Sequence, residues 1–551
     1  MQDLKKEKMK HRVFILQFIF ICIFILILVQ LFKLQIYKSA GIISQAQKQF
    51  YKQQLMLRGD IRDRNGDLLV LDIITYDLYN NTRNVQKVSG EKINKLSKLL
   101  KIKVTDLKNK LNQKVDTKIA SGIKEDIANK IRKSDLNFVY LRPKLTRIYP
   151  HKKMASQVIG FVNSDHKGQH GVEYFHENLI IKRYEGNNES QVFPKGTSIV
   201  LTIDSILQEY AEEELGKTLQ KSKSNRGTVI VMSPKTGEIY AWAVYPNFDP
   251  NLFYKEKSIK NWSITDIYEP GSTFKVITVS SALENMTITQ DSIFYDPGFL
   301  KVGKRIIKNH NQTKPKYLGL LELFKQSSNV ASAQIGLSFK PEEFYSSIKK
   351  FMIGKKTNID LPGESEGLLL NPSKWKTIDL ATTAFGQGAA SLTPLQLACA
   401  ISSIANHGIW VQPHVLKGIW EPTYELINES PYHITQEQVI SKKVAEHVSA
   451  LLKQSVKENL EAMAYIAGNV PGYEVAGKTG TAQKLRPDRK GYWAGHTIAS
   501  FIGYLPADDP EILALVVIDD PKTGGGWGNT IAGPVFNNVA KMAAKRILEN
   551  K

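Results

Sequence analysis

Strand-like segments lie at both ends of the C-terminal half of the chain, with helices expected between them. The five runs cover residues 227–232, 238–244, 473–483, 497–505 and 511–519. The first two read as a β-hairpin joined at residues 233–237, and an amphipathic helix follows the last run. This order predicts an α+β fold with one five-stranded antiparallel sheet, flanked by helices and closed by the two ends of its own domain.

Three short motifs stand within this region and indicate a serine acyl-transfer site. They are Ser272-Thr273-Phe274-Lys275, Ser327-Ser328-Asn329 and Lys478-Thr479-Gly480. A serine hydroxyl is a weak nucleophile until a base takes its proton, and a lysine three residues along a helix stands on the same face. Lys275 is therefore placed to activate Ser272. Pro270-Gly271 breaks regular structure just before the serine, which predicts that Ser272 lies at a helix N-terminus, where backbone N–H groups favour negative charge.

Further motifs accompany these three and extend the pattern over most of the chain. They are Arg58-Gly59 with Asp63-Arg64-Asn65-Gly66, Gly168 to Glu173, Tyr268-Glu269-Pro270-Gly271, Gly386-Gln387-Gly388 with Thr393-Pro394-Leu395-Gln396, and Ala476-Gly477 with Thr481-Ala482. Together with the three catalytic motifs, they make the chain from Arg58 to Phe536 resemble a class B penicillin-binding protein. The resemblance implies a peptidoglycan D,D-transpeptidase domain over residues 226–551, on an elongated, non-catalytic α/β pedestal (dimerisation) domain over residues 33–225.

The resemblance also implies roles for the residues around the nucleophile. Ser272 attacks the penultimate D-Ala carbonyl of a peptidoglycan stem peptide, releases the last D-Ala and passes the acyl group to an amine on a neighbouring strand. Lys275 is the general base, kept neutral by burial and by the charge of Lys478. Ser327 relays a proton to the leaving amine, and Asn329 binds substrate and holds Lys275. β-Lactam antibiotics are then acylating inhibitors, and neither a cofactor nor a metal is required.

The third motif is implied to bind substrate. Lys478 and Thr479 receive the substrate carboxylate, and Gly480 and Thr481 continue the substrate-binding strand. The backbone N–H groups of Ser272 and Thr481 form the oxyanion hole, a kind of contact whose loss costs about 10²–10³ in rate.

The N-terminus predicts a membrane anchor. Residues 13–32 are apolar apart from two glutamines, about the length that crosses a bilayer, and five Lys or Arg residues precede them. The charge places residues 1–12 in the cytoplasm and the rest of the chain outside it, as a single-pass protein of the cytoplasmic (inner) membrane. A cleaved signal peptide is the alternative, but its small-residue site, Ser44-Gln45-Ala46, lies far beyond the apolar core.

Charge and cysteine content limit the partners. The net charge is +21, but the lysines are widely spread, which favours solvated helix faces over a specific polyanion site. No nucleic-acid-binding motif is present, so nucleic acid is not expected as a partner. Cys22 and Cys399 are far apart, so no disulfide framework or cysteine metal cluster is expected.

The pedestal carries two local signals. Asn65-Gly66 between extended segments predicts a hairpin, and the charges before it are expected to pair locally and to have a structural role. Residues 93–134 predict lysine-rich amphipathic helices, because Leu96, Leu99 and Leu100, then Leu107 and Leu111, recur at helical spacing. His170 is expected to be a loop histidine and not a ligand.

A nucleotide hydrolase is the alternative from a different class of protein. Gly472 to Thr479 formally matches the phosphate-binding loop G-x-x-x-x-G-K-[ST]. Residues 473–476 alternate like a strand, however, and Gly480 and Pro487 interrupt the helix that must follow. The predicted topology also places the site outside the cytoplasm, where ATP is scarce.

Several enzyme classes share this kind of serine site. A serine β-lactamase needs a glutamate-activated water, for which Glu364 and Glu366 are the unplaced candidates, and a D,D-carboxypeptidase uses water as acceptor. The long pedestal disfavours both. A β-lactam sensor and a bifunctional glycosyltransferase are disfavoured because the cytoplasmic tail is too short and because residues 33–225 carry no glycosyltransferase pattern. Within class B the chain resembles the septal-division type, FtsI, more than the elongation type, which implies a membrane glycan polymerase of the FtsW type and other division proteins as partners.

Overall fold

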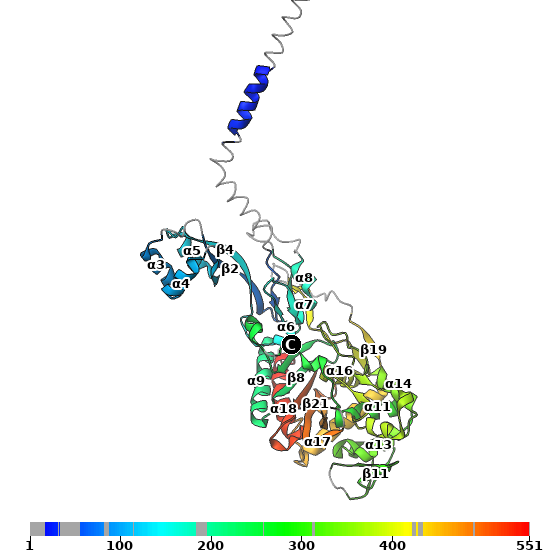
Figure 1. Ribbon diagram of the computed structural model, residues 1–551. Coiled ribbons are helices and arrows are strands. Elements are labelled where there is room, and N and C mark those ends of the chain that lie inside the picture. Colours follow the sequence, from blue (N-terminus) through cyan, green and yellow to red (C-terminus); the bar gives the residue numbers. More distant parts are fainter. Residues whose placement is uncertain are drawn as a thin grey trace, which may run out of the picture. The chain divides into compact units, whose positions relative to one another are not determined.

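The structure, a computed structural model, divides into two compact units that are described separately (Figure 1). The described residues are 17–30, 32, 56–81, 88–113, 115–182, 195–256, 258–310, 314–420, 426–427, 434–486, 488 and 491–549. The smaller unit contains Ile74–Thr146, and the larger contains Arg58–Ile73, Arg147–Lys182 and the chain from Gly196 onward.

The central sheet of the larger unit is the predicted one. It has five antiparallel strands in the order β20-β21-β22-β8-β9, so the first strands of the domain pair directly with the last. The bounds are β8 Arg226–Met232, β9 Ile239–Tyr245, β20 Ala476–Leu485, β21 Tyr492–Leu505 and β22 Ile512–Asp519. β21 begins five residues before the predicted Thr497, because its first residue, Tyr492, pairs with Leu485 at the end of β20.

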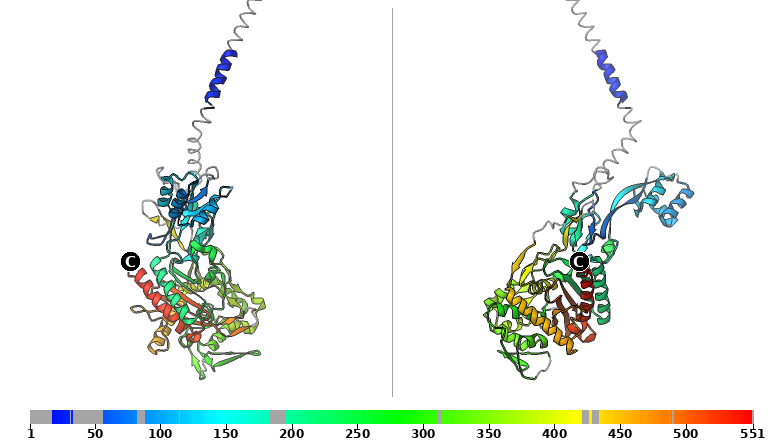
Figure 2. Two further views of the ribbon diagram at one scale, coloured as in Figure 1. Left: turned by 60° about the vertical axis from the view of Figure 1, so that its left-hand side comes forward. Right: turned by 180° about the vertical axis from the view of Figure 1, so that it is seen from behind.

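Helices cover both faces of this sheet, which explains why the middle strand β22 is apolar from Ile512 to Ile518. α9 (Ser205–Ser222) and α18 (Gly533–Ile547) lie side by side against one face (Figures 1 and 2). Val229 and Val231 of β8 belong to the apolar cluster on that face, whereas Ile230 and Met232 belong to the cluster on the opposite face. This alternation follows from the two-residue repeat of a strand.

The opposite face packs against a group of helices that includes α11 (Lys275–Glu284), α16 (Pro394–Ala405) and most of α17 (Lys442–Glu461). The other helices of the larger unit are α6 Ser156–Ile159, α7 Gly171–Phe175, α8 Glu177–Ile181, α10 Trp262–Thr265, α12 Leu320–Gln326, α13 Asn329–Leu337, α14 Pro341–Lys350 and α15 Thr377–Thr383. The short turns of 3₁₀ or π type are η3 Pro250–Lys255, η4 Gly271–Phe274, η5 Pro372–Lys374, η6 Gly524–Gly526 and η7 Gly528–Ala532.

Outside the central sheet, the chain forms a seven-stranded sheet and several two-stranded ladders. Their strands include β5 Phe161–Val162, β6 Gly168–His170, β7 Ser198–Leu201, β10 Phe294–Asp296, β11 Phe299–Val302, β12 Arg305–Lys308, β13 Lys316–Leu318, β14 Leu368–Leu369, β15 Ala390–Ser391, β16 Ile409–Val411, β17 Leu416–Trp420, β18 Leu426–Ile427 and β19 Gln436–Gln438. His170, predicted as a loop residue, ends the short strand β6. The predicted hairpin at Asn65-Gly66 is confirmed, since β1 (Ile61–Arg62) pairs antiparallel with the start of β2 (Leu68–Asn80).

The smaller unit contains one strand that the sequence pattern did not indicate. Its helices are α3 Gly90–Leu100, α4 Val104–Leu111 and α5 Glu125–Arg132, and it also contains most of the long strands β2 and β4 (Val139–Ile148). The expectation of helices throughout residues 93–134 is wrong at β3 (Lys118–Ile123), which pairs with β2. Ile119 and Ile123 enter the core there, while the residues between them stay near the surface. A repeat of four residues fits a helix as well as a strand.

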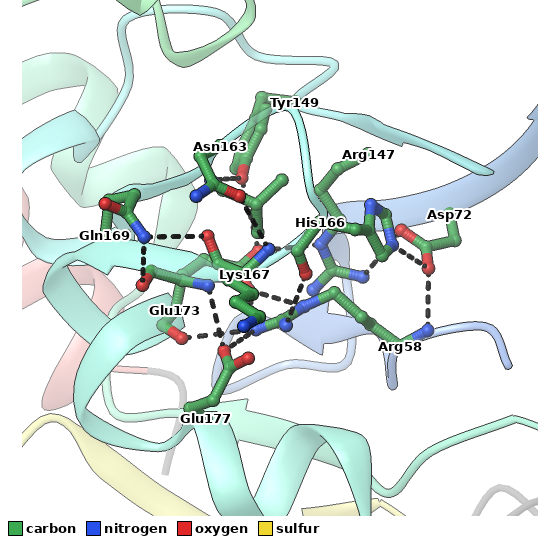
Figure 3. Close-up of polar contacts among 12 residues, drawn as sticks. Arg58, Asp72, Arg147, Tyr149, Asn163, His166, Lys167, Gln169, Glu173 and Glu177 are labelled. Carbon is green, nitrogen blue, oxygen red and sulfur yellow. Dashed lines mark hydrogen bonds and ion pairs between the residues drawn. The ribbon is translucent and has the colours of Figure 1, made fainter. Parts of the chain in front are cut away.

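A buried ion network stands at the start of the larger unit (Figure 3). Arg58 Nη2 lies 2.8 Å from Glu173 Oε2 and 2.6 Å from Glu177 Oε2. Arg147 Nε lies 2.7 Å from the other Glu173 oxygen, and its Nη1 is 3.3 Å from Asp72. The expectation that the charges before the hairpin pair locally is therefore wrong for Arg58, whose partners are 115 and 119 residues away.

The predicted membrane span falls only partly within the described residues. Residues 17–30 are helical, and residues 13–16 and 31 lie outside the described part of the chain. None of the helices in the described part combines the length and the apolar character needed to cross a bilayer.

Candidate active site

Ser272 lies in a tight turn that leads into α11. The turn, η4, precedes α11 directly, so the helix proper begins at Lys275 and not at the serine. Gly271 adopts φ 61°, which favours glycine, and a Cβ there would lie 3.1 Å from the Cβ of Ala482. The turn therefore places the serine directly beside strand β20.

Lys275 is fully buried and is held by the second motif. Its Nζ lies within hydrogen-bond distance of three oxygens, at 2.6 Å from Ser327 O, 3.1 Å from Ser327 Oγ and 2.8 Å from Asn329 Oδ1. Burial lowers the pKa of Lys275 well below its ordinary value, and the nearby charge of Lys478 lowers it further, against a smaller opposite effect of Asp296. A neutral amine, which is the form that can accept a proton, is thus favoured at this position.

Ser327 connects the two lysines of the site. Its Oγ lies 3.1 Å from Lys275 Nζ and 3.1 Å from Lys478 Nζ. It follows α12 as a C-cap in the left-handed conformation, with φ 52°, which is uncommon for a residue other than glycine. One hydroxyl therefore contacts two amines that are far apart in the sequence, and a chain of proton transfers can pass through it.

Asn329 is supported by two residues that the sequence pattern did not single out. Asn309 Oδ1 accepts the N–H of Asn329 at 2.9 Å, and Asn309 Nδ2 donates to Asp296. Asp296 also accepts the hydroxyl of Ser328, the N-cap of α13, at 2.6 Å. These hydrogen bonds hold the second motif in place. No local signal marks Asn309 or Asp296, because their roles depend on contacts across 13 to 32 residues.

Strand β20 carries the third motif. Lys478 is 3% exposed, and burial lowers its pKa to about 7. Its Nζ lies 3.4 Å from Thr479 Oγ1, and Thr481 Oγ1 accepts the N–H of Gly528 at 3.2 Å. A Cβ on Gly480 would lie 3.3 Å from Pro270 O and 2.3 Å from a hydroxyl on β21, so only glycine allows this close approach to the nucleophile turn.

The position of Lys478 excludes the nucleotide-binding alternative. Lys478 pairs with Ile502 in the middle of an antiparallel ladder. A phosphate-binding loop needs a flexible glycine-rich turn that opens a helix. The match over residues 472–479 is therefore a coincidence of composition, as the strand-like alternation predicted.

The structure thus brings together the predicted residues Lys275, Ser327, Asn329 and Lys478, and it places the turn of Ser272 against β20. No hydrogen bond joins Ser272 Oγ to Lys275 Nζ within the described part of the chain. Glu364, one candidate for a water-activating glutamate, instead accepts hydrogen bonds from Thr357 and from the N–H of Asn358 at 3.0 Å. Those partners belong to none of the three motifs.

Comparison with family models gives two matches that follow one another along the chain. Residues 54–189 match the penicillin-binding protein dimerisation domain, and residues 227–541 match the penicillin-binding protein transpeptidase domain.

Individual relatives extend over nearly the whole chain. A peptidoglycan D,D-transpeptidase FtsI homolog from Mesostigma viride is 30% identical, covering 93% of this chain and 92% of the relative. Stage V sporulation protein D of Bacillus subtilis is 31% identical, over 88% and 77%. Among solved structures, penicillin-binding protein 3 of Mycobacterium tuberculosis in complex with aztreonam has a TM-score of 0.70 at 25% identity, over 90% of this chain and 97% of that one.

Proposed function

The chain belongs to the class B penicillin-binding proteins, and from this premise we propose that it cross-links peptidoglycan stem peptides through an acyl-enzyme on Ser272. The observation that carries the proposal is the position of Ser327 Oγ, 3.1 Å from each of two buried lysine amines. The pKa of both amines is lowered by burial, well below the ordinary value at Lys275 and to about 7 at Lys478, so each loses its proton more readily than an exposed lysine does.

The first half-reaction forms the acyl-enzyme. Neutral Lys275 takes the Ser272 hydroxyl proton, and the serine oxygen attacks the carbonyl carbon of the penultimate D-Ala. The N–H groups of Ser272 and Thr481 stabilise the oxyanion, the C–N bond breaks, and the terminal D-Ala leaves with a proton relayed through Ser327. Asn329 holds Lys275 and binds the substrate amide.

The second half-reaction transfers the acyl group. An amine of a second stem peptide attacks the ester carbonyl, and the bond to the serine oxygen breaks. Lys275 takes the proton that the attacking nitrogen loses and returns it to that oxygen. Lys478 and Thr479 bind the carboxylate of the donor, and Gly480 and Thr481 form part of the strand that lies along it. β-Lactams enter the first half-reaction as acylating inhibitors.

We propose the following cellular setting. Residues 13–32 anchor the chain in the cytoplasmic membrane, residues 33–225 form the pedestal, and residues 226–551 form the transpeptidase domain outside the cytoplasm. The FtsI-named relatives support a role in septal wall synthesis. We propose an FtsW-type glycan polymerase and other division proteins as its partners. An elongation-type transpeptidase is the nearest alternative. A serine β-lactamase is less favoured, because none of the contacts of Glu364 links it to the serine.

Labelling with a fluorescent penicillin tests the proposal. We expect a stable adduct on the wild-type protein and none on Ser272→Ala. Ser280→Ala, which changes another serine on the helix that follows Ser272, should label like wild type and serves as the matched control. Rapid loss of label with release of hydrolysed drug would identify a β-lactamase. No label on the wild type would overturn the acyl-transfer function.

A further inference from the structure

A pocket of about 190 Å³ lies beside the nucleophile turn. Two of the segments that line it adjoin the candidate active site in the sequence. Residues 266–269 lead into the turn of Ser272, and residues 483–485 follow Thr481 on β20. Three acidic and two basic side chains line it, namely Asp266, Glu269 and Asp519 with Arg226 and Lys484. The pocket therefore adjoins the two chain segments that hold Ser272 and the third motif.

Four of these charged side chains form two ion pairs. Arg226 Nη2 lies 2.6 Å from Asp266 Oδ2, and Lys484 Nζ lies 2.7 Å from Asp519 Oδ1. Glu269 is 5% exposed and forms no ion pair within the described part of the chain. Burying a carboxylate without a positive partner is costly. Lys260 gives Asp266 a second cation, so Glu269 is the one pocket carboxylate without an ion-pair partner of its own in the described part of the chain.

The Glu269 carboxylate is nevertheless held in place. Tyr492 Oη donates to its Oε2 at 2.8 Å, and the N–H of Gly388 donates to its Oε1 at 3.0 Å. Each carboxylate oxygen keeps further accepting capacity. Tyr268 Oη, also at the pocket wall, is buried and has no hydrogen-bond partner within the described residues. The pocket wall therefore includes both a residue with an oriented carboxylate and a residue with an unpartnered phenol oxygen.

We propose that this pocket receives the primary ammonium group of the acceptor stem peptide, with Glu269 as its counter-charge. The inference rests on the proposed transpeptidase function. A primary ammonium has three N–H donors, and Glu269 and Tyr268 offer acceptors for them. A metal ion fits less well, because no group of three His, Cys, Asp or Glu side chains suited to a metal is found in the part of the chain that the structure describes.

The same carboxylate can prepare the amine for attack. The bound ammonium gives one proton to Glu269, which leaves a neutral amine with a free lone pair. That lone pair attacks the ester carbonyl carbon, a C–N bond forms, and the C–O bond to Ser272 breaks. The nitrogen then loses its second proton, which returns to the serine oxygen through Lys275. Burial raises the pKa of Glu269, which makes its carboxylate a better proton acceptor than an exposed one.

The test separates the second half-reaction from the first. The acyl-enzyme is formed on the full-length protein from an acyl-D-alanyl thioester, and a tripeptide with one free primary amine competes with water for it. We expect Glu269→Gln to lower the ratio of aminolysis to hydrolysis about tenfold or more, because a charge-assisted contact is lost. The rate of acylation by penicillin, which needs no acceptor, should stay within about twofold of wild type.

Glu364→Gln is the matched control. Glu364 is another carboxyl group whose pKa burial raises, it accepts hydrogen bonds from Thr357 and Asn358, and we expect an unchanged ratio. An unchanged ratio in Glu269→Gln would overturn the inference while the transpeptidase function stood. Absence of penicillin labelling in the wild type would instead overturn the function.

A second variant covers the case in which Glu269→Gln is not labelled because it does not fold. Tyr492→Phe keeps the carboxylate but removes the hydroxyl that orients it. We expect a severalfold lower ratio of aminolysis to hydrolysis, with penicillin acylation unchanged. A ratio equal to that of wild type would count against the pocket.

Discussion

The larger unit buries two groups of charged side chains, and they are built in opposite ways. Around Arg58 and Arg147, each cation contacts carboxylates, and Glu173, at 0% exposure, lies between them (Figure 3). Around Ser327, the two buried cationic side chains are Lys275 and Lys478, and their hydrogen bonds go to hydroxyl, carbonyl and amide oxygens. The arginines contact carboxylates, whereas the two lysines contact none in the described part of the chain.

The pKa values follow from this difference. Burial works against the charge of Arg147, but Glu173 and Asp72 raise its pKa above the ordinary value. Burial likewise lowers the pKa of Lys275 and of Lys478, where no carboxylate in the described part of the chain touches either amine to reverse it. A compensated buried group keeps its charge and contributes to the fold, whereas an uncompensated buried amine loses its proton more readily than an exposed one.

The largest expected effect comes from removing the uncompensated base. Lys275→Met should slow acylation by penicillin about 10²–10⁴-fold, the usual contribution of a general base. Stability should be unchanged or higher, because a buried amine is replaced by an apolar chain of similar length. Stopped-flow labelling and thermal melts measure the two quantities. A large loss of stability would mean that Lys275 is mainly structural, and the contrast with the arginine network would disappear.

Glu173→Gln should have the reverse profile. It leaves Arg58 and Arg147 without their shared carboxylate, and breaking a buried pair on one side costs about 3–5 kcal/mol of unfolding free energy. The acylation rate per folded molecule should not change, since the network contains none of the three motifs. Denaturant titration gives the first value and active-site labelling gives the second. If acylation fell while the stability of the variant matched wild type, the network would have to be coupled to catalysis.

Sequence patterns predicted the elements that depend on local spacing. The five strands and the hairpin at Asn65-Gly66 have signals that lie close together along the chain, and so does each of the three motifs. Patterns failed where the partner is distant: Arg58 contacts Glu173 across 115 residues, and Tyr492 contacts Glu269 across 223. They also failed at β3, where buried residues four apart suit helix and strand equally.

The pH dependence of the unfolding free energy tests whether the Lys478 amine is desolvated in the folded protein. Its pKa is about 7 in the folded protein against an ordinary value of 10.5. Between these two values the unfolded chain binds more protons than the folded protein, so the unfolding free energy should rise as pH increases from 7 to 10.5. Lys478→Met should show a smaller rise, because only the contribution of Lys275, whose pKa is also lowered, remains. Melts of both proteins across the range measure the difference, and parallel curves would show that the amine is not desolvated.

Glu177→Gln should have the smallest effect on the unfolding free energy. It tests whether burial of the carboxylate decides how much an ion pair contributes to stability. Glu177 contacts the same Arg58 as Glu173 does, at 2.6 Å, but its side chain is 27% exposed. Because water screens the pair and Arg58 keeps Glu173, we expect a loss of about 1 kcal/mol or less. Equal losses in Glu177→Gln and Glu173→Gln would mean that the number of ion pairs sets stability. A clearly smaller loss in Glu177→Gln would mean that burial of the carboxylate sets it, which is the same property that lowers the pKa of the two lysines at the serine.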